Sequence, residues 1–231
     1  MKNIFENVQP QDLAAEIDRR IRLLAVKNTE GVRAVRREFS VHLRHAANGY
    51  VLDLARELLM RHDRRWVAYE LIASHKEAFG RLNETLVEEF GQGIDSWGAV
   101  DAFARTLSGP AWLWGQVSDE MVWRWAYSPD LWWRRAALVS TVALNIRSQG
   151  GMGDVERTLG VCCILVDDRE DMVVKALSWA LRELVVHDAW AVRDFLAEHR
   201  PELAARVMRE VTNKLEIGLK NPPRSNPESR R

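Results

Sequence analysis

The sequence predicts an all-α protein, and three observations lead to that prediction. Apolar residues recur at helical spacing through most of the 231 residues, as Leu13, Ile17 and Ile21 illustrate. Stretches that strictly alternate apolar and polar residues, as half-buried β-strands do, are missing. The segments between the periodic stretches are short and carry glycine, proline, asparagine or aspartate, which end helices.

The expected helices follow one another along the chain, each with apolar residues three or four positions apart. In order, they are 12–25, 32–46, 51–62, 65–74, 84–90, 96–107, 118–126, 132–146, 155–166, 172–186, 190–199 and 202–214. The connectors between them are identified by their turn-forming residues. The clearest are Ser108-Gly109-Pro110, Ser128-Pro129-Asp130, Gln149-Gly150-Gly151-Met152-Gly153-Asp154 and His199-Arg200-Pro201.

A degenerate internal repeat relates the later helices to one another. Residues 130–136 align with residues 170–176, and an acidic residue precedes the helix in both copies. Arg135 then corresponds to Lys175, and residues 63–68 form a looser copy. Helix pairs that repeat at about 40 residues are typical of HEAT-type solenoids, whose inner helices line a concave groove. We therefore expect a HEAT-like helical-repeat solenoid with such a groove.

The composition suits one domain with a substantial core, because 47% of the residues are apolar. We expect this domain over residues 1–219 and, because residues 220–231 carry three prolines, a loose tail there. No apolar stretch approaches the roughly 20 residues of a membrane span, and the first residues do not resemble a signal peptide. Adjacent Cys162 and Cys163 lie in an apolar run and are expected to be buried and reduced. These features predict a cytoplasmic, nucleoid-associated protein without membrane contact.

The net charge is zero, but the charges are unevenly distributed. Basic residues outnumber acidic ones between Arg19 and Arg65, whereas acids concentrate at residues 84–89 and 167–171. Such a distribution permits a phosphate-facing side on a neutral protein, although solvated helix faces are the commoner explanation. The six histidines show no spacing suited to a metal ion, so we expect neither a metal nor a cofactor.

Ten tryptophans are many for this length, and core packing explains most of them. Adjacent Trp132 and Trp133 point about 100° apart on a helix, so at most one faces the centre of the core. Three clusters place indoles beside charged residues, which suits a cationic ring held against a polyanion and favours damaged nucleic acid as the partner. The clusters are Asp95-Ser96-Trp97-Gly98-Ala99-Val100-Asp101, Leu131-Trp132-Trp133-Arg134-Arg135-Ala136-Ala137 and Trp179-Ala180-Leu181-Arg182-Glu183.

With these clusters, the chain resembles the AlkD-type DNA alkylation-repair glycosylases over residues 31–221. The resemblance rests on the order and spacing of short motifs, and it implies an all-helical enzyme that removes N3- and N7-alkylated purines from double-stranded DNA. It further implies a lesion held in the duplex within an open groove rather than turned into a deep pocket. A solenoid that follows DNA needs no protein partner, so we expect a monomer. Besides the clusters, the motifs are Gly31-Val32-Arg33, Asn213-Lys214-Leu215 and Leu219-Lys220-Asn221-Pro222.

Position by position, the resemblance places the catalytic acid at Asp101 and the two tryptophans of the cleft at Trp97 and Trp179. Two departures concern the range of substrates more than activity. Gly98 follows Trp97, where the family often has an acid, and residues 6–38 lack the aromatic residue expected from an early helix.

The predicted DNA contacts are basic residues of the same motifs. The resemblance places the phosphate-contacting arginine at Arg135, although a bond between repeats is an equally good explanation and both roles can coexist. Arg182 belongs to the third cluster, and Arg134 neighbours Arg135. Lys175 occupies the position of Arg135 in the next repeat, and Arg33 lies in the basic region.

These residue types suit the chemistry of alkylated purines. Alkylation at N3 or N7 makes the base a cation that leaves as a neutral molecule, so the enzyme must stabilise the oxocarbenium-like sugar and place a water molecule. A carboxylate serves both needs. Indole faces attract cations by about 0.5–2 kcal/mol each. Trp97 and Asp101, four residues apart, project from one face of a helix.

Structural alternatives exist for the same residues. Trp97 could pack in the core while Asp101 pairs with Arg105, and Trp179 could be a core indole beside a surface arginine at Arg182. Two other classes of protein are also compatible with the sequence: a catalytically silent DNA-structure binder of the same superfamily, and a HEAT-type scaffold for protein interactions. A scaffold needs no acid at residue 101, and a silent binder shows salt-dependent DNA affinity without base release.

Overall fold

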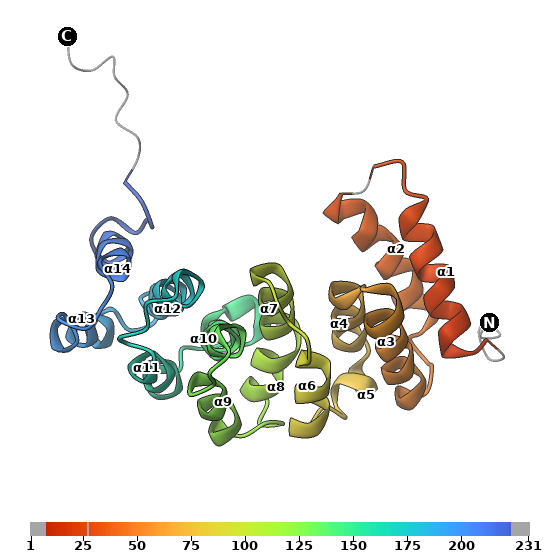
Figure 1. Cartoon of the computed structure of the whole chain (residues 1–231), viewed down its shortest axis with the longest axis horizontal. Helices are drawn as coiled ribbons and strands as arrows, with labels where there is room; N and C mark the ends of the chain where they lie inside the picture. The colour runs from red at the N-terminus through yellow and green to blue at the C-terminus, as the bar shows by residue number, and fades with distance from the viewer. Residues whose placement is uncertain (1–7, 27, 223–231) are drawn as a thin grey trace, which may run out of the picture. The chain divides into compact units, whose positions relative to one another are not determined.

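The computed structural model describes residues 8–26 and 28–222, and all of their regular structure is helical. The chain divides into two compact units, Met1–Ser118 and Asp119–Arg231. Figure 1 labels the helices of both units. The first unit contains α1 (Pro10–Arg22), α2 (Thr29–His42), α3 (Asn48–His62), α4 (Arg65–Ser74), α5 (Lys76–Phe79), α6 (Glu84–Gly91), α7 (Trp97–Phe103), a π-helix (Ala104–Ser108) and α8 (Gly109–Leu113). The second contains α9 (Asp119–Ala126), α10 (Leu131–Asn145), a 3₁₀ turn (Arg147–Gln149), α11 (Val155–Ile164), α12 (Asp171–Leu184), α13 (Ala189–Glu198) and α14 (Ala205–Ile217).

Side-chain caps explain where several of these helices begin. The backbone N–H groups of a first helical turn have no partner inside the helix, and a preceding polar side chain accepts from one of them. Asn28 Oδ1 accepts from the Gly31 N–H at 2.8 Å at the start of α2. Asp188 Oδ1 does the same for Ala191 at 2.8 Å at the start of α13.

The second unit has the layered packing of a helical repeat. Helix α12 packs between α10 and α14, and α11 contacts both α10 and α12 from the other layer (Figure 1). Helices α10 and α12 begin at Leu131 and Asp171, which is the spacing of about 40 residues that the internal repeat predicts. Ala136 and Ala176, aligned in that repeat, are both fully buried. The predicted all-α helical-repeat fold is confirmed.

In the first unit, α4 is the central helix, because α2, α3 and α7 all pack against it. Tyr69 of α4 is fully buried, and its hydroxyl donates to the Phe90 carbonyl at 2.8 Å. Its ring lies 5.8 Å from that of Phe103 at the end of α7. These contacts hold α4 and α7 side by side, and the candidate site lies on those two helices.

The predicted connector at residues 108–110 is wrong, because the chain remains helical there. Helix α7 passes into a π-helix, and the Gly109 N–H donates to the carbonyl of Ala104, five residues earlier. Pro110 has no N–H to continue the α-helical ladder, which accounts for the change of hydrogen-bond pattern at this place. The short helices α5 and α8 were not predicted, since four or five residues are too few to show a periodicity.

Smaller expectations have mixed outcomes. Cys162 is buried as predicted, and burial raises the pKa of its thiol, but Cys163 on the same helix is exposed. Most of the expected tail, residues 223–231, lies outside the described residues. Within 8–26 and 28–222, no helix combines the length and apolar character needed to cross a membrane.

A buried carboxylate in α1 provides a test of the stability of the first unit. Asp18 is 5% exposed and accepts hydrogen bonds from Arg22 at 2.6 Å and Arg64 at 2.9 Å. Asp18→Asn should lower the free energy of unfolding by about 2–3 kcal/mol, since it removes the charge of a buried carboxylate that two arginines contact. Urea unfolding followed by circular dichroism measures this. Glu16→Gln, which removes an exposed carboxylate from the same helix, should change it by less than about 0.5 kcal/mol.

The same contact has a predicted pH dependence. Burial raises the pKa of Asp18, but the hydrogen bonds from Arg64 and Arg22 outweigh burial, so the pKa lies below its ordinary value. The stabilisation is therefore complete above the pKa of the unfolded chain and is lost as the pH falls through the lower pKa of the folded chain. The difference in stability between wild type and Asp18→Asn should shrink in acid, and a difference that stays constant would contradict this role.

Candidate functional site

Helix α7 presents the predicted tryptophan and acid on one face. Ser96 begins the helix, and its Oγ accepts from the Ala99 N–H at 3.4 Å. Trp97 is the first helical residue and is 60% exposed. Asp101 follows one turn later and is half-buried. The alternative in which Trp97 packs in the core is therefore wrong, and an indole and a carboxylate lie side by side on one face of this helix.

A change of backbone geometry follows directly after this acid. The π-helix begins three residues after Asp101, at Ala104. Such stretches are rare and frequently occur at functional sites. The position of the acid beside one is consistent with a site on this part of the chain.

A cavity of about 310 Å³ opens next to the same helix within the first unit. Val32 of α2, Trp66 of α4 and Gly98 and Ala102 of α7 contribute to its walls. Trp66 was not singled out from the sequence. Its signal was its place in the looser repeat copy at residues 63–68, since the copy at residues 130–136 also carries aromatic residues.

The predicted contact Arg33 belongs to the surroundings of this cavity. Its guanidinium lies 5.0 Å from the centre of the Trp66 ring and 3.3 Å from the Glu70 carboxylate. The side chain is still 48% exposed. The structure thus places Arg33 beside Trp66, and its contact with a phosphate stays a prediction.

In the second unit, α12 carries three predicted residues along one face. Lys175, Trp179 and Arg182 are spaced by four and three positions, so they lie above one another on the helix. Lys175 pairs with Asp171 at 2.7 Å and is 37% exposed. The Trp179 Nε1–H donates to Glu183 at 2.9 Å, and this indole is half-buried.

Arg182 is held by a polar network between α12 and α14. Its Nε–H donates to Ser178 Oγ at 3.3 Å, and the Ser178 hydroxyl in turn donates to the buried Glu210 carboxylate at 2.7 Å. Burial lowers the pKa of Arg182, against the opposing effect of Glu210 and Glu183. Half-buried and tied to two helices, the guanidinium has a fixed position on this face.

The two arginines of the second cluster are mostly engaged inside the protein. Arg135 is only 5% exposed and donates to the carbonyl of Met172 at the start of α12. Arg134 donates to Asp168 at 2.7 Å and to the Ser128 carbonyl at 3.0 Å, and it is 17% exposed. For Arg135 this geometry favours the alternative of a bond between repeats. DNA contact by Arg134 stays a prediction, whereas we expect Arg135 to act mainly as the link between repeats.

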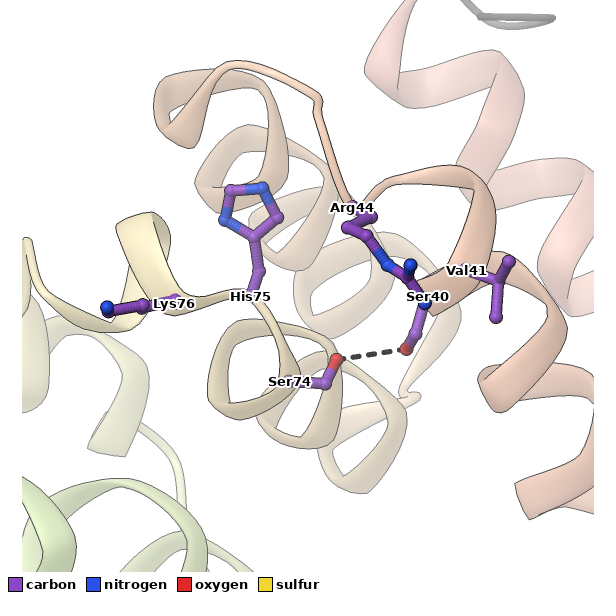
Figure 2. Close-up of a pocket in the computed structure, with 6 residues that line it drawn as sticks. All are labelled: Ser40, Val41, Arg44, Ser74, His75 and Lys76. Carbon is purple, nitrogen blue, oxygen red and sulfur yellow. Dashed lines mark hydrogen bonds between the residues drawn. The ribbon is translucent and has the colours of Figure 1, made fainter. Parts of the chain in front are cut away.

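A second cavity of the first unit, of about 250 Å³, lies between the ends of α2 and α4 (Figure 2). Ser40 and Ser74, two of the residues that line it, share a hydrogen bond of 2.9 Å. His75 Nδ1 accepts from the Ala78 N–H at 3.0 Å, and its buried Nε2 has no hydrogen-bond partner among the described residues. Figure 2 shows Lys76 pointing away from the serine pair. Because these polar groups do not point toward one common place, we assign no ligand to this cavity.

The fold and the face of α7 define a helical-repeat protein that presents an exposed indole, Trp97, beside a carboxylate, Asp101. A family model described as DNA alkylation repair enzyme matches residues 5–215. The chain belongs to this family of DNA alkylation repair enzymes, which confirms the resemblance. No curated protein and no solved structure matches the chain.

Proposed function

We propose that this protein is a DNA glycosylase that hydrolyses the glycosidic bond of N3- and N7-alkylated purines. Membership of the family supports repair of alkylation damage. The observation that carries the finer assignment is Trp97, which stands 60% exposed one helical turn before Asp101. An exposed indole beside a carboxylate is a poor solution for packing and a good one for binding a positively charged ring.

The proposed reaction needs one acid and one water molecule. The bond between C1′ of the sugar and N9 of the purine breaks, and its electron pair neutralises the cationic base. The sugar develops positive charge, which the Asp101 carboxylate stabilises. Asp101 also orients the water whose oxygen bonds to C1′, and the proton of that water leaves to the carboxylate or the solvent. The indole of Trp97 lies against the charged ring or the sugar.

Residues of the second unit are assigned to the DNA in the same proposal. Lys175 and Arg182 share the face of α12 with Trp179, and arginines and lysines neutralise phosphates. The assignment of Trp179 to the lesion rests on the order of the family motifs alone. Arg134 and Arg33 complete the proposed contacts, with side chains 17% and 48% exposed.

The experiment that tests the function is release of free base from duplex DNA that carries 7-methylguanine or 3-methyladenine, followed by chromatography. We expect release from both duplexes and none from an undamaged duplex. Binding without release would identify a silent DNA binder, and DNA affinity should then still fall steeply with salt. Neither binding nor release would favour a scaffold for protein interactions.

The exposed indole allows a test that leaves the fold intact. Trp97→Ala should slow base release about 2- to 30-fold, because a contact between an indole and a cation contributes about 0.5–2 kcal/mol. The free energy of unfolding should change by less than about 0.5 kcal/mol, since the side chain is mostly solvated. Single-turnover release and urea unfolding measure the two effects. Trp114→Ala, which removes an indole 67% exposed elsewhere in the unit, is the control and should leave the rate unchanged.

A further inference from the structure

The last two motifs of the resemblance, residues 213–215 and 219–222, fold against each other at the end of α14. Gly218 follows the helix with a φ of 72°, a left-handed conformation that glycine adopts without strain and that turns the chain back. The Asn213 side-chain amide donates to the Lys220 carbonyl at 3.1 Å. One motif is thus bonded to the other, and neither takes part in the proposed reaction.

This turn brings the ammonium group of Lys220 to a buried carboxylate of α14. Lys220 Nζ lies 3.5 Å from Glu210 Oε2. The Glu210 side chain is only 5% exposed, whereas that of Lys220 is 44% exposed. Because a buried carboxylate is costly unless its oxygens are paired, Glu210 needs such partners. The lysine is therefore held at a fixed place while part of its side chain stays at the surface.

The same carboxylate oxygen also reaches the neighbouring helix α12. Glu210 Oε2 accepts from the Ser178 hydroxyl at 2.7 Å, and Ser178 Oγ accepts from Arg182 Nε at 3.3 Å. Ser178 is fully buried, so water does not compete for these bonds. One carboxylate oxygen thus links Lys220, beyond the end of α14, to Arg182 on α12.

The cluster carries more positive than negative charge. Its three cations are Arg182, Lys220 and Arg209, whose guanidinium lies 4.0 Å from Glu210 Oε1. The acids that act on Arg182 are Glu210 and Glu183. The excess of positive charge attracts anions, and an arginine beside a lysine suits a phosphate, which the first binds with directed hydrogen bonds and the second as a point charge.

We propose that Glu210 is a positioning residue that holds Arg182 and Lys220 together as a two-point contact for one phosphate group of double-stranded DNA. The inference rests on the proposed action on DNA, in which Arg182 is one of the contacts, and it adds Lys220 as a second. Because Arg182 shares the face of α12 with Trp179, the bound phosphate lies next to the indole assigned to the lesion.

A positioning acid has an effect on DNA affinity opposite in sign to that of its charge. A carboxylate near DNA ordinarily repels the phosphates and weakens binding. Glu210 instead orders two long side chains before the DNA arrives, so less side-chain freedom is lost on binding. The difference in sign separates this role from simple electrostatics.

The first test measures binding of an undamaged duplex, because phosphate contacts do not depend on the lesion. Glu210→Gln removes a negative charge, so electrostatics alone predicts tighter binding, whereas the positioning role predicts an affinity about 3- to 10-fold lower. Glu216→Gln, which removes an exposed acid from the same helix, is the matched control and should bind at least as tightly as wild type. Anisotropy titrations measure affinity, and urea unfolding shows where Glu210→Gln is folded.

Lys220 provides a second test, which does not depend on the stability of Glu210→Gln. Lys220→Ala should lower affinity about 5- to 10-fold at about 0.1 M salt and reduce the slope of log affinity against log salt by about 1. Lys220→Arg keeps the charge and should keep the slope. Arg193→Ala, which removes an exposed cation from α13, should leave the slope unchanged. In the Lys220→Ala background, Glu210→Gln should weaken binding less than in wild type, because one cation that it positions is absent.

Each outcome bears on one of the two proposals. Unchanged or tighter binding by Glu210→Gln overturns the positioning role, and an unchanged slope for Lys220→Ala overturns the phosphate contact. Because the readout is binding to undamaged DNA, the expected effects without release of alkylated bases overturn only the proposed glycosylase. Base release by wild type, with an affinity that neither variant lowers, overturns only this inference. A wild type that binds no duplex overturns both.

Discussion

Replacing Asp101 by asparagine is expected to remove most base release from duplex DNA containing 7-methylguanine while leaving the fold unchanged. Asparagine has nearly the shape of aspartate but no charge, so it cannot stabilise the positive sugar in the same way. Loss of one preorganised electrostatic contact to a transition state slows a reaction about 10²- to 10³-fold. DNA affinity should change little, because a carboxylate contributes no attraction to phosphate.

Comparison with Asp95→Asn shows whether the effect depends on the position of Asp101 or only on the loss of one negative charge. Asp95 lies in the same motif, is exposed, and precedes the cap residue Ser96. Its variant removes the same charge and should keep the rate of base release. Urea unfolding of both variants separates catalysis from the alternative in which Asp101 pairs with Arg105. A destabilised Asp101→Asn that still releases base at the wild-type rate would assign Asp101 to structure.

The fold was predictable because helical periodicity and turn residues are local signals. Helices α4 and α9 lie within one residue of their expected bounds, at Arg65–Ser74 and Asp119–Ala126. The π-helix at Ala104–Ser108 was not predictable from periodicity. In a sequence, Gly109-Pro110 predicts the end of a helix. In the structure, the chain stays helical across these two residues, as the π-helix is followed directly by α8.

The candidate site was predictable in its motifs but not in its surroundings. Motif order placed Trp97 beside Asp101, and the structure added the exposure that excludes a core role for the indole. Arg134 donates to Asp168 and Arg135 donates to Met172, each more than 30 residues away, and local spacing gives no sign of these long-range partners. Long-range partners of this kind decide whether an arginine faces solvent.

The cavity at Trp66 was likewise not predictable from the sequence. In the sequence, Gly98 is a departure from the family pattern and Trp66 is part of a weak repeat copy. Only packing of α4 against α7 makes the two residues walls of one space.

Arg135 and Lys175 occupy the same position of the internal repeat, and opposite effects are expected from replacing each by alanine. Arg135 is 5% exposed and donates to the Met172 carbonyl of α12. Arg135→Ala removes a charged hydrogen bond and opens a void, so the free energy of unfolding should fall by about 2–4 kcal/mol. Lys175 is 37% exposed and pairs with exposed Asp171, so Lys175→Ala should lower it by less than about 1 kcal/mol.

The effects on DNA should be reversed. Lys175→Ala should weaken binding to any duplex and reduce the slope of log affinity against log salt by about 1, as expected for one lost phosphate contact. Arg135→Ala, measured well below its unfolding midpoint, should keep affinity within about threefold and leave that slope unchanged. Anisotropy titrations at several salt concentrations, beside urea unfolding, give both quantities. An Arg135→Ala variant of wild-type stability with a reduced slope would show that this arginine contacts phosphate, because a residue that only joins two helices has no means of changing the number of released counterions.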